Sequence, residues 1–324
     1  MAKKRIAVLT SGGDAPGMNA AVRAVVRTSI YYGFEVLGVY RGYDGLINGD
    51  LKLLGKGDVA NIIHRGGTIL KTARSEEFRT VEGRAKAAKV LQAENVEGLV
   101  VVGGNGSYTG AMKLSEEHNI KVVGLPGTID NDIYGTDYTI GFDTAINTAV
   151  EAVDKIRDTA DSHSRLFFIE VMGRHSGYIA LYTGIGSGAS KVFLPERDDD
   201  IKEFLTELKE AGRRNKLFNL VIVAEGNTNG GAAEMAAKVK GVVDMDVRTA
   251  VIGHLQRGGA PTASDRYLAS KLSYNAVKAL LDGQSSIAVG LVDKKIVYTP
   301  LHEAISKKKE PEDGIIQMAE ILSL

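Results

Sequence analysis

Glycine pairs follow two apolar runs of this chain, and both pairs could bind phosphate. Ser11-Gly12-Gly13 follows the run that ends at Thr10, and Gly103-Gly104 follows the run 99–102. A polar segment that could begin a helix comes after each pair. Bare backbone N–H groups and the positive end of a helix both favour a phosphate group. In one sheet the two turns could hold two ends of one polyphosphate, although each alone is equally well a plain strand-to-helix turn.

Three carboxylates lie close together in the segment GLPGTIDNDIYGTD, which follows another apolar run. Asp130, Asp132 and Asp137 fall within eight residues. Clustered carboxylates beside a phosphate loop repel one another unless a cation or a substrate proton is bound there. One of them could act as a general base toward an alcohol, as phosphoryl transfer requires. The alternative is a structural loop, because Asp and Asn favour turns.

Two further glycine-rich segments carry cations. Arg174 lies in VMGRHSGY just after a predicted strand, and His254 and Arg257 lie in GHLQRGG at the end of another predicted strand. A lone arginine is usually a surface charge. Two arginines and a histidine at glycine-rich strand ends indicate anion binding.

Short apolar runs alternate with helical patterns along most of the chain, which predicts an α/β protein with mostly parallel sheets and right-handed crossovers. At 324 residues the chain should form two domains. The predicted strands are 5–10, 35–40, 98–104, 121–126, 165–173, 191–196, 220–226 and 247–254, and predicted helices include 18–32, 142–160 and 263–281.

The composition excludes several classes of function. Forty basic residues balance forty acidic ones, which argues against nucleic acid or an anionic membrane as the main partner. The absence of cysteine excludes disulfides and thiolate metal sites. The chain has no apolar run that approaches a membrane span and no signal peptide, so we expect a soluble, cytoplasmic protein.

The common nucleotide-binding motifs are absent or incomplete. Gly104, Gly106 and Gly110 form GxGxxxG, one residue off the dinucleotide spacing, and no acidic ribose ligand follows. The sequence also lacks GxxxxGK[ST], HExxH and GxSxG. A Rossmann dehydrogenase and a P-loop NTPase are therefore disfavoured.

Taken together, the motifs resemble those of the bacterial ATP-dependent 6-phosphofructokinases over essentially the whole chain. The segments that carry the resemblance, in the family's order, are 9–21 (LTSGGDAPGMNAA), 65–74 (RGGT…TAR), 103–108 (GGNGSY), 126–132 (PGTIDND), 155–159 (KIRDT), 170–174 (EVMGR) and 253–259 (GHLQRGG).

The resemblance implies transfer of the γ-phosphoryl group of MgATP to the 1-hydroxyl of fructose 6-phosphate. Asp130 would be the base, with Thr128 beside the transferred group, and Arg174 would stabilise developing charge. Mg²⁺ would be held by Asn105 and Asp132. The residues implied for ATP are Gly13, Arg74, Gly104, Asn105, Gly106 and Ser107. The residues implied for the sugar phosphate are Thr128, Asp130, Asp132, Arg165, Met172, Gly173, Arg174, Glu225, Arg248, His254 and Arg257.

The resemblance also implies a fold of two three-layer α/β/α domains of Rossmann-like type, with the active site in the cleft between them. A larger ATP-binding domain would comprise 1–139 and 253–304. A smaller domain for fructose 6-phosphate would comprise 140–252 and 305–324.

The spacing of the arginines favours an oligomer. Arg165 and Arg174 bracket one predicted strand and are nine residues apart, a span of about 30 Å in an extended strand. Arg248 and His254 are about 20 Å apart by the same rise. A hexose phosphate is far shorter, so both arginines can serve one substrate only from different subunits, which fits the family's homotetramer. If Arg165 is only a surface charge, this argument disappears.

Some positions depart from the family's pattern. Asn105 replaces an aspartate that helps to hold magnesium, which removes one negative charge and predicts weaker use of magnesium. Gly106 and Gly127 stand where pyrophosphate-using relatives carry Asp and Lys, so ATP is favoured as donor. The effector site for ADP or phosphoenolpyruvate is incomplete, since Ser190, Leu217 and Phe218 replace family contacts. The candidate effector contacts that remain are Arg23, Arg27, Lys56, Arg157, Arg214 and Lys216.

Three functions remain open on the sequence. The first is an active ATP-dependent 6-phosphofructokinase. The second is a silent or weakened paralogue that binds nucleotide and sugar phosphate as a regulatory protein, motivated by Asn105. A kinase for another sugar or for NAD would share the glycine loop but not EVMGR and GHLQRGG.

Overall fold

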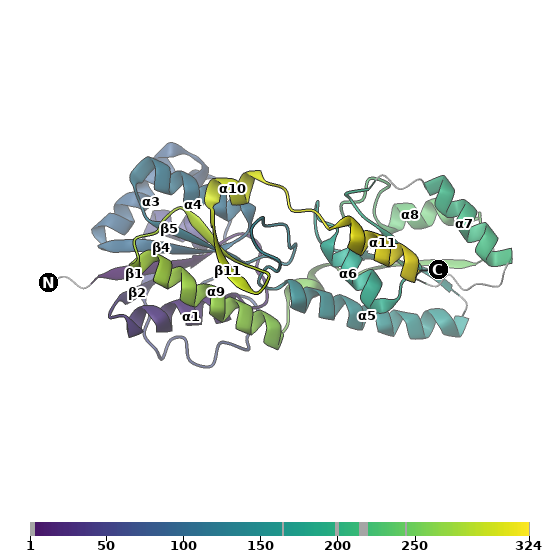
Figure 1. The fold of residues 1–324 in the computed structure, drawn as a ribbon, viewed down its shortest axis with the longest axis horizontal. Helices are drawn as coiled ribbons and strands as arrows, with labels where there is room; N and C mark the ends of the chain where they lie inside the picture. The colour runs from purple at the N-terminus through teal and green to yellow at the C-terminus, as the bar shows by residue number, and fades with distance from the viewer. Residues whose placement is uncertain (1–3, 164, 198–200, 214–219, 244, 324) are drawn as a thin grey trace. The chain divides into compact units, whose positions relative to one another are not determined.

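The computed structural model describes residues 4–163, 165–197, 201–213, 220–243 and 245–323. The chain divides into two compact units, drawn in Figure 1. Unit 1 comprises Met1–Thr144 and Arg257–Lys309, and unit 2 comprises Ala145–Gln256 and Glu310–Leu324. None of the helices in the described part of the chain has the length and apolarity that a membrane span requires.

Unit 1 contains a mostly parallel sheet with the strand order β11-β10-β5-β4-β1-β2-β3. Strand β3 pairs antiparallel with β2 and β11 pairs antiparallel with β10, while the neighbouring pairs between β2 and β10 are parallel. The strands are β1 (Arg5–Thr10), β2 (Glu35–Val39), β3 (Leu51–Leu53), β4 (Val96–Gly103), β5 (Val122–Pro126), β10 (Ile287–Val292) and β11 (Lys295–Pro300).

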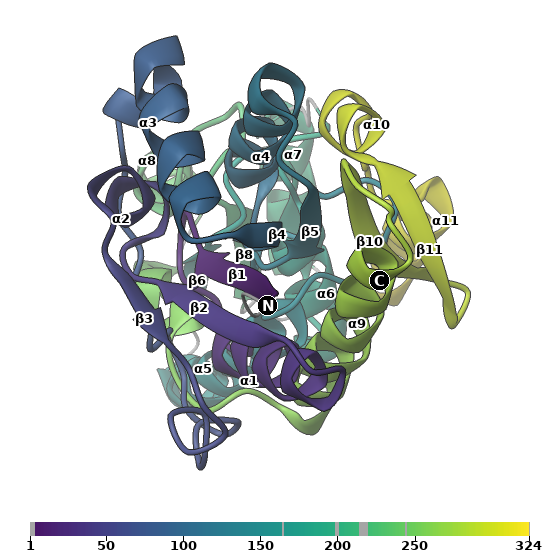
Figure 2. The ribbon, with the colours of Figure 1, turned by 90° about the vertical axis from the view of Figure 1, so that its left-hand side faces the viewer.

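Helices cover both faces of this sheet, as Figure 2 shows. On one face α1 (Met18–Tyr31) packs against α9 (Ala263–Leu281). The other face carries α2 (Gly42–Asn48), α3 (Val81–Ala93), α4 (Asn105–His118) and α10 (Leu301–Ser306), with the short 3₁₀ turn η1 (Glu77–Arg79). Because both faces are covered, the central strands are continuously apolar instead of alternating.

Unit 2 contains a parallel sheet with the order β7-β8-β6-β9. Its strands are β6 (Arg165–Val171), β7 (Lys191–Phe193), β8 (Leu220–Ala224) and β9 (Asp246–Val251). Alternate side chains of β6 and β8, including Phe168 and Val221, pack against α7 (Ile201–Arg213) and α8 (Ala232–Val239). The other helices are α5 (Phe142–His163), α6 (Tyr178–Ser187) and α11 (Asp313–Leu322).

The predicted fold class is confirmed, since both units are α/β with mostly parallel sheets. Several strands differ from their predicted bounds. Strand β6 ends at Val171, because Gly173 has a positive φ of 145° that leaves the extended region. Strand β7 ends at Phe193, before Pro195. The antiparallel hairpin of β10 and β11 had no predicted counterpart, because its edge strand mixes charged and apolar residues.

A buried carboxylate ties the start of α5 to the start of α9. Asp265 Oδ1 accepts a hydrogen bond from Gly141 N at 2.8 Å, and its Oδ2 accepts from Thr144 N at 2.8 Å and Thr144 Oγ1 at 2.5 Å. Burial raises the pKa of Asp265, although these donors oppose the shift. Thr262 caps α9 by accepting from Asp265 N, and its own N–H donates to Thr144 Oγ1. The chain is therefore fixed where it leaves unit 1 at Thr144.

Replacing Asp265 by alanine should destabilise unit 1. The change leaves the two backbone N–H groups and the Thr144 hydroxyl buried without their acceptor, at a cost of about 3 kcal/mol. Urea unfolding followed by circular dichroism should show the loss as a lower midpoint. Asp265→Asn keeps one acceptor oxygen and should lie between the alanine variant and the natural protein. Equal midpoints for all three proteins would contradict the role of this carboxylate.

Candidate functional site

The carboxyl ends of β1, β4 and β5 lie side by side in unit 1, and the glycine turns follow directly. Thr10 pairs with Val102, and Gly103 pairs with Pro126. Ser11 N donates to Val102 O at 3.0 Å, and Gly127 N donates to Gly103 O at 3.1 Å. The prediction that one sheet carries both glycine turns is confirmed. The turns after these three neighbouring strands thus meet at one edge of the sheet, where ligands of open α/β sheets commonly bind.

The turns approach so closely that a side chain cannot fit between them. A Cβ at Gly103 would lie 2.6 Å from Ser11 O and 2.5 Å from Ser107 Oγ. At Gly106, by contrast, a Cβ would meet no atom within 4 Å, so this residue faces open space. Gly104 precedes the first turn of α4 and gives no side-chain cap. Gly104 O accepts hydrogen bonds from Ser107 N and Tyr108 N, so the amides of Asn105 and Gly106 are those that the first turn offers to an anion.

Arg257 reaches the first glycine turn. Its Nη1 donates to Asp14 O at 3.0 Å, and a Cβ at Gly13 would lie only 2.5 Å from the same nitrogen. The absence of a side chain at Gly13 is what admits the guanidinium. Arg257 thus adds a positive charge to the backbone N–H groups of this turn.

The segment 128–139 holds the predicted base in a fixed loop. Asp130 is 5% exposed, and its N–H donates to Thr128 Oγ1 at 3.2 Å. Asn131, with a φ of 53°, donates to Asp137 O and accepts from Thr139 N. Thr139 Oγ1 donates to Thr128 O at 2.6 Å. These bonds brace the backbone on both sides of Asp130.

Asn105 and Asp132 are the pair predicted to hold a metal, and the structure brings them together. Asn105 Nδ2 donates to Asp132 Oδ2 at 2.9 Å. The Asn105 amide oxygen and the Asp132 carboxylate are oxygen ligands of the kind that a hard cation prefers. Among the described residues, no group of three or more His, Asp or Glu side chains is placed to hold a metal by itself. The donors fit Mg²⁺ that is held by one or two protein oxygens and by substrate phosphates.

Lys309 is a member of this site that the sequence did not indicate. Its Nζ donates to Asp137 O at 2.8 Å. Burial lowers the pKa of Lys309 to about 8, and the charges of Asp137 and Asp132 partly oppose the shift. In the sequence it ends the run 307–309 of three lysines, which is typical of a solvated surface. Only the fold shows that the third lysine reaches the carboxylate loop.

In unit 2, the ends of β6 and β8 bring Arg174 and Glu225 together. Arg174 N donates to Glu225 Oε1 at 2.7 Å, and Glu225 N donates to Val171 O. Arg174 has a φ of 55°, a conformation that costs energy for a residue with a side chain and is found often at functional sites. Met172 N donates to Oε1 of the buried Gln256, a residue not singled out from the sequence.

Arg165 and Arg248 lie together near the other end of the same strands. Arg165 is the first residue of β6, and Arg248 belongs to the neighbouring β9. Both guanidinium groups contact Asp246 Oδ2, at 3.0 Å and 2.9 Å. Arg174 follows the far end of β6, and exposed His254 follows the far end of β9. The structure thus separates the candidate anion binders of unit 2 into two groups.

Comparison with known proteins gives the family. The family model described as Phosphofructokinase matches residues 5–280. This chain belongs to the phosphofructokinase family. It is 56% identical over 321 residues to ATP-dependent 6-phosphofructokinase 1 of Thermus thermophilus, covering 99% of this chain and 100% of the relative. It is 52% identical to ATP-dependent 6-phosphofructokinase of Bacillus subtilis, with the same coverage.

Solved structures agree with this assignment. Phosphofructokinase from Saccharomyces cerevisiae matches with a TM-score of 0.87 and 43% identity, over 94% of this chain and 45% of the yeast chain. A pyrophosphate-dependent phosphofructokinase from Marinobacter aquaeolei matches with a TM-score of 0.83 and 24% identity, over 95% of this chain and 86% of that chain, which supports the fold alone.

The remaining predicted contacts of this phosphofructokinase are divided between unit 1 and unit 2. Arg74 and Lys56 are exposed in unit 1. Arg23 and Arg27 lie one turn apart on α1, where burial and then Arg27 lower the pKa of Arg23. Arg157 belongs to unit 2, and its Nη2 donates to Ser187 O at the end of α6, a helix-capping role. The predicted effector contacts Arg214 and Lys216 lie outside the described residues.

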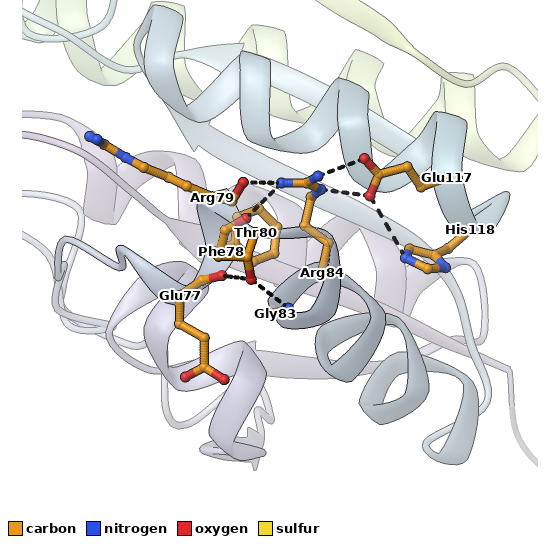
Figure 3. Close-up of polar contacts among 8 residues, drawn as sticks. All are labelled: Glu77, Phe78, Arg79, Thr80, Gly83, Arg84, Glu117 and His118. Atoms are coloured by element: carbon orange, nitrogen blue, oxygen red, sulfur yellow. Dashed lines mark hydrogen bonds and ion pairs between the residues drawn. The ribbon is translucent and has the colours of Figure 1, made fainter.

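A cluster of polar contacts around Arg84, drawn in Figure 3, connects the segment after Arg74 with α4. Arg84 on α3 donates from Nε and Nη2 to the two carboxylate oxygens of Glu117, at 2.6 and 2.7 Å. Its Nη1 donates to the carbonyl oxygens of Phe78 and Arg79 in η1. Glu117 belongs to the last turn of α4, the helix whose first residue is Asn105. This Arg84 cluster therefore fixes the helix that begins at the glycine turn.

Replacing Glu117 by glutamine should cost about 2 kcal/mol of unfolding free energy at pH 7, because Arg84 is nearly buried and loses its charged partner. Arg84 lowers the pKa of Glu117, so the ion pair stabilises fully above about pH 4.5 and its contribution disappears as pH falls through the lowered pKa. The difference in unfolding midpoint should therefore shrink in acid. Glu76→Gln, which changes an exposed carboxylate beside η1, is the control, and a difference that stays constant with pH would contradict this explanation.

Proposed function

We propose that this protein transfers the γ-phosphoryl group of ATP to the 1-hydroxyl of fructose 6-phosphate, giving ADP and fructose 1,6-bisphosphate, a step of glycolysis. One observation carries the proposal: the braced, buried Asp130 follows the strand next to the two glycine turns. The match of 50–56% identity over whole chains named ATP-dependent 6-phosphofructokinase supports ATP as donor. Open space at Gly106 fits a phosphate beside the start of α4.

The residues of unit 1 can carry out the central proton transfer. As the hydroxyl oxygen forms its bond to the γ-phosphorus, the bond from that phosphorus to the bridging oxygen of ADP breaks. The hydroxyl proton passes to the carboxylate of Asp130. Thr128 lies next to the transferred group, and the backbone around Gly13 and Gly104 to Ser107 binds the donor phosphates. We assign Arg174 to charge that develops on the transferred group.

Magnesium ion fits the pair of Asn105 and Asp132. When bound, the ion neutralises charge on the phosphates of the donor. Asn105 would offer Oδ1 and Asp132 a carboxylate oxygen, while their mutual hydrogen bond holds both side chains in place. An amide carries no net charge, so we expect this pair to bind magnesium more weakly than two carboxylates would.

Binding of the sugar phosphate, in this proposal, requires residues from a second copy of the chain. We assign Met172, Gly173, Glu225 and His254 to the sugar, and Arg165 and Arg248 to its 6-phosphate. Arg165 and Arg174 occupy opposite ends of β6, and an extended strand of this length is far longer than a hexose phosphate. Arg165 and Arg248 therefore serve the site of a neighbouring copy, which supports a homo-oligomer, of which a tetramer is the family's form.

A second candidate function is a silent paralogue that binds nucleotide and sugar phosphate without turnover. The specific observation in its favour is the hydrogen bond between Asn105 and Asp132. Two carboxylates at these positions would repel each other and would need a cation between them, whereas the amide and the carboxylate need none. The retained Asp130 and Arg174 speak against it.

Turnover of ATP and fructose 6-phosphate in a coupled assay tests the proposal. Asp130→Asn should lower kcat by about 10³-fold, because the general base is lost. Asp137→Asn changes an exposed carboxylate of the same loop and should stay close to the natural protein. Calorimetric titration with ATP should give similar affinities for all three. Equal turnover of the Asp130 variant would refute the assigned base.

Absence of turnover in the natural protein, together with binding of both ligands, would favour the silent paralogue. Asn105→Asp then decides the cause. Recovered activity in that variant would trace the silence to the missing carboxylate.

Mixing two inactive variants tests the shared site. Arg165→Ala and Arg174→Ala should each abolish turnover at low substrate concentration. In a mixed pair of copies, one site has lost both arginines and the other keeps both, so an isolated mixed pair should show about half of the natural activity and an unfractionated random mixture about a quarter. Co-expressed variants with distinct affinity tags allow the mixed oligomer to be isolated and assayed. A mixed oligomer as inactive as its parents would show that each site is built from one copy.

A further inference from the structure

Asp246 places one carboxylate oxygen between two arginines. Oδ2 accepts hydrogen bonds from Arg165 Nε and from Arg248 Nε, each at 3.0 Å, and forms an ion pair with Arg248 Nη2 at 2.9 Å. Arg165 and Asp246 are direct neighbours across β6 and β9, while Asp246 and Arg248 are two residues apart and point to the same face of β9. Strand pairing therefore fixes all three side chains in one group.

The carboxylate takes the donors that a phosphate would use. Nε and Nη2 form the edge of Arg248 that binds carboxylates and phosphates through two parallel hydrogen bonds. Of this edge, Nε donates to Asp246 Oδ2 and Nη2 lies 2.9 Å from the same oxygen. The hydrogen bonds from Arg248 and then Arg165 lower the pKa of Asp246, so it is ionised at neutral pH. The ionised Asp246 lowers the net charge of Arg165, Asp246 and Arg248 together from two positive charges to one.

The group is open to solvent and its internal bonds are weak. The side chains of Arg165, Asp246 and Arg248 are 26%, 46% and 54% exposed. Ion pairs at this exposure contribute little to stability, because water screens them. An anion from solution can therefore displace the carboxylate.

We propose that Asp246 competes with the 6-phosphate of the substrate for Arg165 and Arg248, and so sets the affinity of the enzyme for sugar phosphate. The proposal rests on the proposed function, in which these arginines bind that phosphate. Asp246 is a positioning residue that acts through the arginines. Its carboxylate neutralises and holds them until a phosphate, with more charge and more acceptor oxygens, takes the same donors.

Asp246→Asn tests the competition, because the amide keeps the size of the side chain and removes the negative charge. The KM for fructose 6-phosphate should fall about fivefold, while kcat and the KM for ATP change less than twofold. Glu203→Gln is the control, since it removes one exposed negative charge from α7 of the same unit. It should leave all three constants unchanged.

Binding of inorganic phosphate, measured by calorimetry, gives a readout that does not depend on turnover. Asp246→Asn should bind phosphate about fivefold more tightly than the natural protein, and adding Arg248→Ala should remove the gain. Tighter phosphate binding in a protein that does not turn over would support the competition and count against the proposed function. A higher KM, weaker phosphate binding or no change in either would overturn the proposal, because Asp246 would then serve only to orient the arginines.

Discussion

Parallel pairing of β1, β4 and β5 is the constraint on which the candidate site of this phosphofructokinase depends. It places the ends of three strands at one edge, with the backbone of Gly127 hydrogen-bonded to Gly103 and that of Ser11 to Val102. Neighbouring strands in a sheet lie less than 5 Å apart. Where the chain turns at the ends of two such strands, the backbones are so close that little space is left for side chains. Glycine at position 103 follows from this distance, since a Cβ there would collide with Ser11 O.

The loop that carries the proposed base, Asp130, is held by hydrogen bonds from its neighbours. Asn131, Thr139 and Lys309 hydrogen-bond to the loop that carries Asp130. The Arg84 cluster fixes α4, and so fixes Asn105 opposite Asp132. A loop braced in this way loses little entropy when a ligand binds, which suits the role of general base that we propose for Asp130. The site of unit 1 is therefore largely formed before any ligand arrives.

The fold class, the adjacent glycine turns and the pairing of Asn105 with Asp132 were predictable, because each depends on a local pattern or on a recognisable motif. Asp246 and Lys309 were not. Asp246 meets Arg165 across 81 residues of sequence, and only the register between β6 and β9 brings them together. The sequence around Lys309 is typical of a surface lysine, and its contact with the carboxylate loop arises only because the folded chain returns to that loop. Local sequence patterns do not indicate contacts that depend on the register between strands or on segments far apart in the sequence.

Strand geometry also places an acid between two arginines of unit 2. An extended strand cannot fold back, so Arg165 and Arg174 stay at opposite ends of β6 however the loops around them move, which supports the proposal that they serve different substrate molecules. Arg165 and Arg248 carry like charges on adjacent strands, and such neighbours repel. Asp246 relieves this repulsion by contacting both guanidinium groups. If the pair binds the 6-phosphate as we propose, the same carboxylate that stabilises the arginines in the free protein must weaken that binding.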